Sequence, residues 1–146
     1  MTMKRNGSSW VQADDYGRKL PTFSVNLLVR DVQASLPFYR DVLGAIVRYA
    51  DEDFAALSLA GAEFMLHADH TYDDHPLHNY ISGVTDGRRG LGAELRVMGV
   101  DPDAAEARAK AAGAKIVQPA ADYPHGWRDV MLADPDGYVW AVGIAI

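Results

Sequence analysis

Four of the five histidines of this chain fall within one short segment, where their spacing raises the question of metal binding. The segment reads "HADHTYDDHPLH" and contains His67, His70, His75 and His78 together with aspartates. Histidine and aspartate side chains at such spacings are ligands for zinc or nickel. The segment is polar, lacks the rigid spacing of a helical HxxxH pair, and receives no support from cysteine, which is absent. We therefore expect incidental metal affinity here, or a lid formed by His67, Tyr72 and His75.

A second group of residues is suited to binding a ligand by stacking. The stretch "YPHGWRDV" holds Tyr123, His125 and Trp127, with Gly126 allowing a tight backbone path. Aromatic side chains at the lip of a cleft stack on planar or cationic ligands. The alternative is that Trp127 packs against the N-terminal segment or a second subunit. Arg128 then forms only a structural ion pair with Asp129 or Asp136.

Recognisable catalytic motifs are missing from the chain. It has no nucleophile elbow, phosphate-binding loop or dinucleotide-binding glycine pattern. Proton transfer without a metal requires a base such as His67, Glu94 or His125, and the sequence does not show any of them positioned for that role. We assign no catalytic residue. The run Asp86-Gly87-Arg88-Arg89-Gly90 is interpreted as a solvated turn, with an anion clamp by the two arginines as the alternative.

Composition narrows the class of protein. A chain of 146 residues fits a single domain with an ordinary core. The net charge of −6 argues against a nucleic-acid partner and mildly favours neutral or cationic ligands. No apolar run approaches the ~20 residues of a membrane span, and the N-terminus lacks the apolar core of a signal peptide. The absence of cysteine suits a reducing cytoplasm.

The pattern of elements occurs twice. Each copy is predicted to contain a strand, a helix and three further strands. In the first copy Asp31 caps the helix and Gly44 ends it, and Pro37 either kinks the helix or marks its first turn. In the second copy Asp103 is the expected cap and Gly113 the terminator. The turn Asp134-Pro135-Asp136-Gly137 joins the last two strands. The predicted strands lie within 22–30, 45–50, 54–60, 62–68, 91–100, 115–120, 127–133 and 137–146.

These repeats define the expected organisation. Residues 1–21 form a polar extension whose Trp10 and Tyr16 dock on the body or on a partner subunit. A single domain covers 22–146, with module one at 22–69, a polar linker at 70–90 and module two at 91–146. A linker of about twenty residues usually carries function or disorder.

The paired modules, with "VRDVQASLPFYRDVLGA" in the first and "DPDGYVWAV" closing the second, resemble the vicinal oxygen chelate superfamily. This superfamily contains glyoxalase I, extradiol dioxygenases and bleomycin-resistance binding proteins. The resemblance implies an α+β fold in which two βαβββ modules curl their sheets into half-barrels. It also implies that the two half-barrels meet in a cleft, commonly completed by a homodimer.

Enzymes of this superfamily hold a divalent metal through one residue on the first and one on the last strand of each module. The corresponding positions here fall on Ser24, Met65, Ala93 or (with a one-residue slip) Glu94, and Ala141. At most one of the four is a competent ligand, so the resemblance points to the metal-depleted, binding branch and to no cofactor. Weak candidates for a metal remain His67 and Glu94.

Strand alternation predicts which neighbours share the cleft-facing side. Ser24, Asn26, Met65 and His67 face in together, and Glu94 or Arg96 joins them. We expect a metal-independent, homodimeric protein that sequesters an aromatic or cationic small molecule at seven residues: Ser24, Asn26, Met65, His67, Tyr123, His125 and Trp127. The alternatives are a lyase or isomerase of the glyoxalase class that uses a divalent ion such as zinc or nickel, and a scaffold with a filled cleft.

Overall fold

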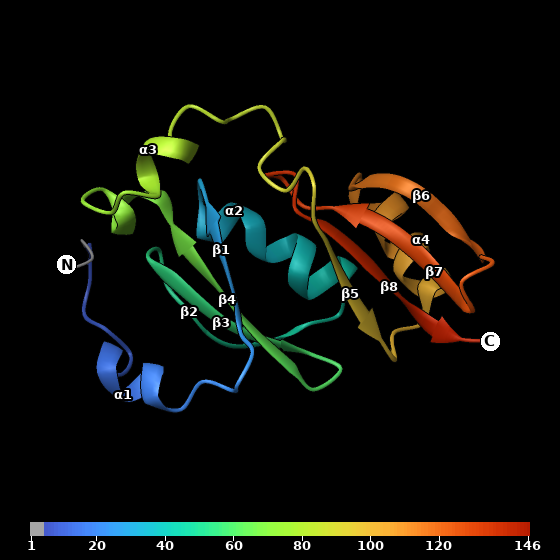
Figure 1. Cartoon of the computed structure of the whole chain (residues 1–146), viewed down its shortest axis with the longest axis horizontal. Helices are drawn as coiled ribbons and strands as arrows, with labels where there is room; N and C mark the ends of the chain where they lie inside the picture. Colours follow the sequence, from blue (N-terminus) through green and yellow to red (C-terminus); the bar gives the residue numbers. More distant parts are fainter. Residues whose placement is uncertain (1–4) are drawn as a thin grey trace.

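The computed structural model describes residues 5–146 and shows two four-stranded sheets lying side by side, with helices packed between and behind them (Figure 1). In each sheet the first strand of the module pairs in parallel with the last, and the other neighbours are antiparallel. The predicted α+β class with two βαβββ modules is confirmed, although the sheets are not closed into a barrel. Among the described residues, no helix is both long enough and apolar enough to cross a membrane.

Module one forms the sheet called sheet A here, with the strand order β1-β4-β3-β2. Its elements are β1 Val25–Val29, α2 Val32–Pro37, the π-helical turn η1 Phe38–Val42, β2 Ile46–Ala50, β3 Phe54–Leu59 and β4 Ala62–Ala68. Asp31 caps α2 as predicted, because its Oδ1 accepts the Ala34 N–H at 3.0 Å.

Pro37 does not mark the first turn of the helix. It is the last residue of α2, and the helix continues from Phe38 as a π turn in which the Leu43 N–H donates to the Phe38 carbonyl at 3.0 Å. A proline has no N–H to give to the preceding turn and crowds the carbonyl four residues earlier. A wider turn is one way in which a helix accommodates such a disturbance.

Module two forms sheet B, with the order β5-β8-β7-β6. Its elements are β5 Glu94–Met98, α4 Pro102–Ala112, β6 Lys115–Asp122, β7 Trp127–Ala133 and β8 Val139–Ala145. The predicted cap Asp103 is wrong, because the carboxylate of Asp101 accepts the N–H groups of Asp103 and Ala104. Pro102 takes the first helical position, which makes the residue before it the cap.

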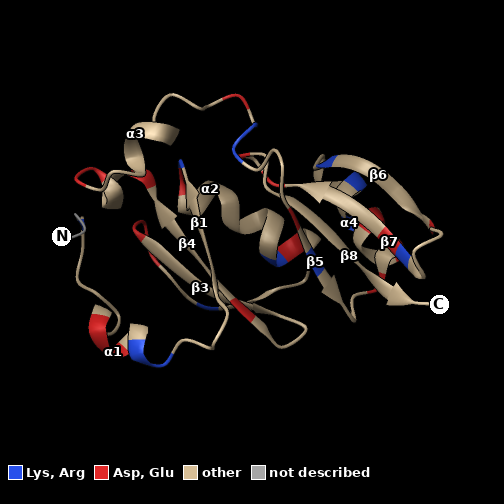
Figure 2. Ribbon diagram, in the orientation of Figure 1, with Lys and Arg blue, Asp and Glu red and all other residues tan. Residues whose placement is uncertain are grey.

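The rest of the chain lies around these modules. The N-terminal arm, defined here as residues 5–21, contains α1 Ala13–Arg18, and the segment between the modules contains η2 Asp69–Tyr72 and α3 His78–Ile81. Residues 1–4 of the predicted extension lie outside the described residues. Lys and Arg are scattered over both modules among Asp and Glu (Figure 2).

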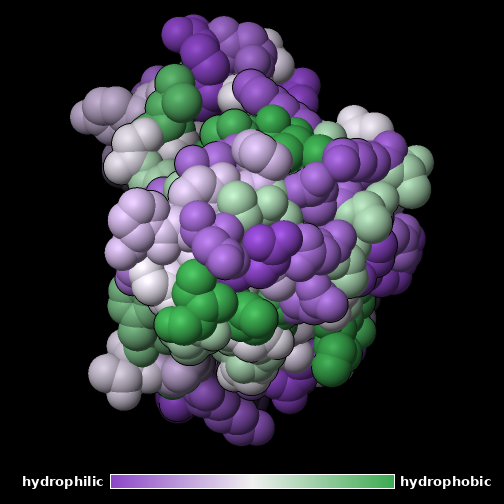
Figure 3. All heavy atoms as spheres, turned by 90° about the vertical axis from the view of Figure 1, so that its right-hand side faces the viewer, coloured by the Kyte–Doolittle hydropathy of each residue, from purple (hydrophilic) through white to green (hydrophobic). Residues whose placement is uncertain are grey.

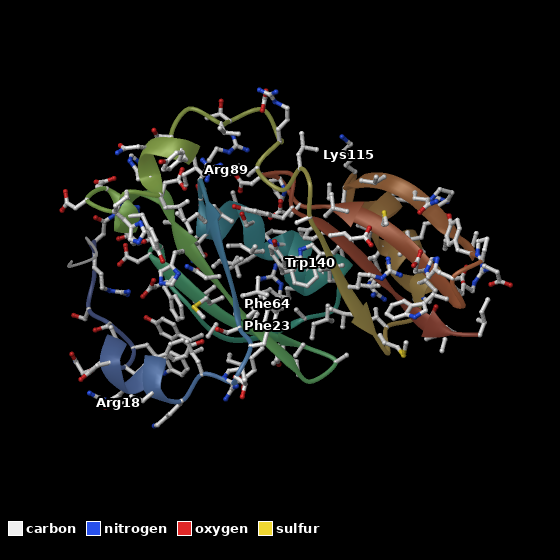
Figure 4. The ribbon with its side chains drawn as sticks, viewed as in Figure 1. Arg18, Phe23, Phe64, Arg89, Lys115 and Trp140 are labelled. Atoms are coloured by element: carbon white, nitrogen blue, oxygen red, sulfur yellow. The ribbon has the colours of Figure 1, made fainter. Side chains whose placement is uncertain are left out.

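One hydrophobic core joins the helix-covered faces of both sheets. Trp140 of β8 meets Phe64 of β4 with ring centroids 4.8 Å apart and Tyr39 of η1 at 5.7 Å, and Figure 4 shows Phe64 and Trp140 together at the centre of the molecule. Trp140 therefore faces the helix layer, as alternation predicts from Ala141. The predicted stripe Val32, Leu36, Tyr39 and Leu43 is buried in the same core.

The predicted turn at Asp134–Gly137 does more than reverse the chain. Asp134 Oδ1 accepts the N–H groups of Asp136 and Tyr138, and Oδ2 accepts the hydroxyl of Tyr39 at 2.7 Å. Burial raises the pKa of Asp134 to about 6, although the hydrogen bonds to Tyr39 and the backbone work in the opposite direction. This carboxyl group therefore links the last hairpin of module two to the helix of module one.

Candidate ligand-binding site

The predicted residues of module one lie together on the face of sheet A that is turned away from α2, called its open face. Asn26 is paired in register with Met65, and His67 follows two residues later on β4. Asn26 Oδ1 lies 2.6 Å from His67 Nδ1, and Asn26 Nδ2 donates to the Tyr72 hydroxyl at 2.8 Å. Ser24 lies just before β1 and is half-buried.

The hydrogen bond to Asn26 defines the state of His67. An amide oxygen can only accept, so Nδ1 of His67 carries the hydrogen and Nε2 keeps its lone pair. Burial, assisted by the positive charge of Arg5, lowers the pKa of His67 to about 4. At neutral pH the ring is therefore uncharged and acts as a hydrogen-bonding and stacking group.

The N-terminal arm covers this open face. Tyr16 and Leu20 of the arm pack against Phe54, Ala56 and Met65 of the sheet. As a result Met65 is 6% and His67 8% exposed. The arm thus docks on the body of the same chain, which was one of the two alternatives for its aromatic residues.

The predicted aromatic residues of module two gather on the open face of sheet B, the face turned away from α4. The His125 and Trp127 ring centroids are 6.5 Å apart, and the Tyr123 ring is parallel to that of His125 at 6.0 Å. The Arg96 guanidinium lies over Trp127, 4.7 Å from the ring centroid. Trp127 therefore already stacks on one planar cation.

Asp129 also lies on this face, although the sequence suggested for it only an ion pair with Arg128. Its Oδ2 accepts from Arg96 at 2.8 Å and lies 3.1 Å from His125 Nε2. The residue is 1% exposed, and its Oδ1 has no hydrogen-bond partner. Alternation along β7 places Asp129 on the same face as Trp127, and this pattern could have identified it from the sequence. Arg128, the expected ion-pair partner, instead binds Asp103 and Asp122.

The structure also resolves the register of β5. Leu95 and Val97 pack into the helix-side core, so Glu94 and Arg96 are on the open face, where Glu94 Oε1 accepts from Arg96 at 2.9 Å. Arg96 is paired with Ala141 of β8. At this position of sheet B, the methyl group of Ala141 therefore lies beside Arg96.

The two predicted sets do not form one cleft within the chain. Asn26, Met65 and His67 belong to sheet A, whereas His125 and Trp127 belong to sheet B, and no described contact joins the sets. The single cleft expected around all seven residues is thus two separate faces in this chain. A ligand-binding role of either set remains a prediction.

The four positions that hold a metal in enzymes of the resembled superfamily do not fit one here. Met65 is buried under the arm, Ala141 has no donor atom, and Glu94 is ion-paired with Arg96. The weak candidates His67 and Glu94 lie on different sheets. Across residues 5–146, no group of three or more His, Asp or Glu side chains is arranged to hold an ion.

The histidine-rich segment contributes to the structure in other ways. His70 Nε2 lies 2.5 Å from Asp53 Oδ1, while His75 packs on Tyr72 with ring centroids 4.8 Å apart. Tyr72 in turn contacts His67 at 5.6 Å, so the three rings of the suggested lid do lie together.

The interpretation of Asp86–Gly90 as a solvated turn is wrong for Arg89. Its side chain is 1% exposed and makes two hydrogen bonds of 2.7 Å to the carboxylate of Asp69 and one of 3.1 Å to the Leu28 carbonyl. Figure 4 shows Arg89 beside the end of β1. Arg88 remains exposed.

Comparison with known proteins is consistent with this geometry. Solved structures that share the fold include a glyoxalase-related enzyme from Fulvimarina pelagi (22% identity, 85% of this chain and 87% of that one, TM-score 0.63), a glyoxalase/bleomycin resistance protein/dioxygenase family enzyme from Burkholderia phytofirmans PsJN (22%, 84% and 97%, 0.65) and a protein of unknown function from Agrobacterium tumefaciens (23%, 94% and 98%, 0.65). No curated protein sequence matches the chain. A family model matches residues 23–142. The chain therefore belongs to the Glyoxalase/Bleomycin resistance protein/Dioxygenase superfamily.

Proposed function

We propose that this protein binds and sequesters a small planar cation on the open face of sheet B, without a metal ion and without making or breaking a bond. The observation that carries the proposal is Asp129, a carboxylate 1% exposed whose Oδ1 lacks a hydrogen-bond partner. Arg96 pairs with Oδ2 of this carboxylate, but a buried oxygen without a donor is costly, so Oδ1 beside the half-buried ring of Trp127 favours a cationic ligand that donates a hydrogen bond.

The chemistry of the face supports this choice of ligand. The Arg96 guanidinium stacks on Trp127 and bonds to both Glu94 and Asp129, so a planar cation already satisfies these three groups. A planar aromatic cation that displaces Arg96 meets the same ring and the same two carboxylates. Aromatic rings and carboxylates together attract such cations more strongly when water is excluded.

The proposed site needs no metal, because the ring of Trp127 and the carboxylates of Glu94 and Asp129 supply the contacts to the ligand. Stoichiometric capture lowers the free concentration of the ligand by mass action alone. We place this activity in the cytoplasm, supported by the absence of cysteine. Across the part of the chain that the structure describes, no cluster of His, Asp or Glu side chains favours the superfamily's metal-dependent lyase and isomerase chemistry.

We also propose that the functional unit is a homodimer. Large apolar side chains stay exposed, among them Phe23 at 81%, Leu91 at 71% and Met98 at 49%. Seen from the module-two end, Figure 3 shows separate hydrophobic patches among hydrophilic atoms. Sedimentation equilibrium at micromolar concentration tests this; a monomer at all concentrations would exclude it.

Proflavine, a planar aromatic cation, is a suitable probe for the site. We expect saturable quenching of tryptophan emission that persists after dialysis against EDTA. Trp127→Phe should remove most of the quenching, and Asp129→Asn should weaken binding about tenfold, the effect of losing roughly 1.4 kcal/mol of interaction. Asp122→Asn is the matched control, since it removes an equal charge from an exposed position of sheet B.

The opposite results are equally clear. Equal affinity of Asp129→Asn and Asp122→Asn would show that the buried carboxylate is not part of a cation site. Binding that disappears with EDTA and returns with zinc or nickel would favour the metal-dependent alternative.

A further inference from the structure

We propose that the N-terminal arm and sheet A enclose a second binding site, for a planar apolar molecule that carries one anionic group. This site is separate from the proposed cation site on sheet B and does not depend on it. The arm precedes the residues that match the superfamily model, which begin at residue 23.

The space is a cavity of about 570 Å³ between the arm and strands β2, β3 and β4. This volume is in the range of pockets that bind small organic molecules. Its apolar wall consists of Trp10, Val11, Tyr16, Leu20, Ala56 and Leu57. Figure 1 shows α1 alongside sheet A, and Figure 4 marks α1 by Arg18 at the periphery of the molecule.

The aromatic side chains of the arm are held in place by the sheet. Trp10 stacks on Tyr49 with ring centroids 4.8 Å apart and an interplanar angle of 7°, and Tyr16 meets Phe54 edge-on at 5.3 Å. Rings fixed in this way lose little freedom when a planar ligand packs against them. The cavity is thus walled by aromatic groups that are already oriented.

A polar anchor holds the beginning of the arm. The fully buried carboxylate of Asp53 accepts the N–H groups of Asn6 at 3.1 Å and Gly7 at 3.2 Å, and Arg5 bonds to Asp51 at 2.8 Å. Burial acts to raise the pKa of Asp53, but the hydrogen bonds from His70 and from these two amides outweigh it and hold the pKa below the usual value. The arm is therefore anchored through an ionised group at neutral pH.

The charges at the cavity indicate the sign of the ligand. Arg48 pairs with Glu63, and Asp15 pairs with Arg18, so three of the lining charges lie in ion pairs. Lys19 also lines the cavity, and its exposed side chain has no ion pair or hydrogen bond with any described residue, whereas its backbone N–H donates to the Tyr16 carbonyl. The unmatched charge at the wall is thus positive, and a carboxylate on the ligand complements it.

The binding of 2-naphthoate, measured by titration calorimetry and by the shifts of the Trp10 indole resonance, tests this proposal. We expect saturable binding to the full-length protein and several-fold weaker binding of the neutral 2-naphthamide. Lys19→Gln should abolish that preference for the anion. Trp10→Ala should weaken 2-naphthoate about fivefold, the effect of about 1 kcal/mol of lost stacking.

Controls separate this site from the one on sheet B. Trp127→Phe should leave 2-naphthoate binding unchanged, and Trp10→Ala should leave proflavine binding unchanged. Deletion of residues 1–20 should abolish 2-naphthoate binding, and urea unfolding shows whether the shortened chain is folded. If it is not folded, the binding of 2-naphthoate by Trp10→Ala and Lys19→Gln tests the proposal. The proposal is overturned if the full-length protein does not bind 2-naphthoate saturably at millimolar concentration. It is also overturned if Trp10→Ala and Lys19→Gln both bind like the wild type.

Discussion

Acidification should destabilise the protein through His67, and the size of the effect follows from where this side chain lies. The ring is 8% exposed and hydrogen-bonded through Nδ1 to Asn26. Burial first, and then the charge of Arg5, lowers its pKa from 6.5 to about 4. The perturbation we consider is a shift from pH 7 to pH 4 in the wild type and in His67→Gln, which cannot titrate.

The unfolded chain takes up a proton at His67 near pH 6.5, whereas His67 of the folded protein takes up this proton only near pH 4. Between these values the unfolded state binds more protons, so the free energy of unfolding falls as the pH falls. A difference of 2.5 pKa units corresponds to about 3 kcal/mol. This stability is fully present above pH 6.5 and is lost by about pH 4.

Urea unfolding at pH 7, 5.5 and 4 measures this effect. The quantity of interest is the free energy of unfolding of the wild type minus that of His67→Gln, because other titrating groups cancel in the difference. It should decrease by about 3 kcal/mol across this range. Proton NMR of the ring gives the folded-state pKa independently. Removal of residues 1–20 should raise that pKa, since it takes away Arg5 and the covering side chains of the arm.

A difference that stays constant from pH 7 to pH 4, or a ring that titrates near pH 6.5 in the folded protein, would refute this reasoning. Either result would mean that His67 is accessible to water. The arm would then not cover the open face of sheet A as described.

Three further predictions concern the contacts that hold the modules together. Asp134 should have the opposite pH dependence, because its pKa is raised from 3.8 to about 6 and the folded state therefore keeps a proton that the unfolded chain loses. The free energy of unfolding of the wild type minus that of Asp134→Asn should gain about 2 kcal/mol as the pH falls from 6 to 4. A flat difference in urea unfolding would contradict the burial of this carboxyl. Arg89→Met should lower the free energy of unfolding by about 3 kcal/mol, because it leaves Asp69 without its partner, whereas the exposed Arg88→Met should cost less than about 1 kcal/mol. Equal losses would show that Arg89 is solvated after all. Gly137→Ala should be more damaging than Gly113→Ala, by at least about 1 kcal/mol in thermal unfolding: both residues have positive φ, but only at Gly137 would a Cβ overlap the backbone of Gly87.

The order and type of the elements could be predicted from the sequence because their signals are local. Alternation along strands placed Asn26, Met65 and His67 on one face of module one, and Trp140 on the helix-covered face of module two. Asp31 and Gly113 act within one helical turn of their own position. The error at Asp103 arose because aspartates flank Pro102 on both sides; the preference of proline for the first helical position, which indicates Asp101, was overlooked.

What only the tertiary structure decided depends on contacts between residues far apart in the chain. The arm could dock on its own chain or on a partner, and the choice rests on Tyr49, Phe54 and Asp53, more than thirty residues away. Arg89 looked solvated in a polar linker, and only the carboxylate of Asp69 and the end of β1 explain its burial. The distribution of the predicted site over two sheets depends on how Tyr39, Phe64 and Trp140 pack, since residue patterns specify the faces of a sheet but not the position of one sheet relative to another.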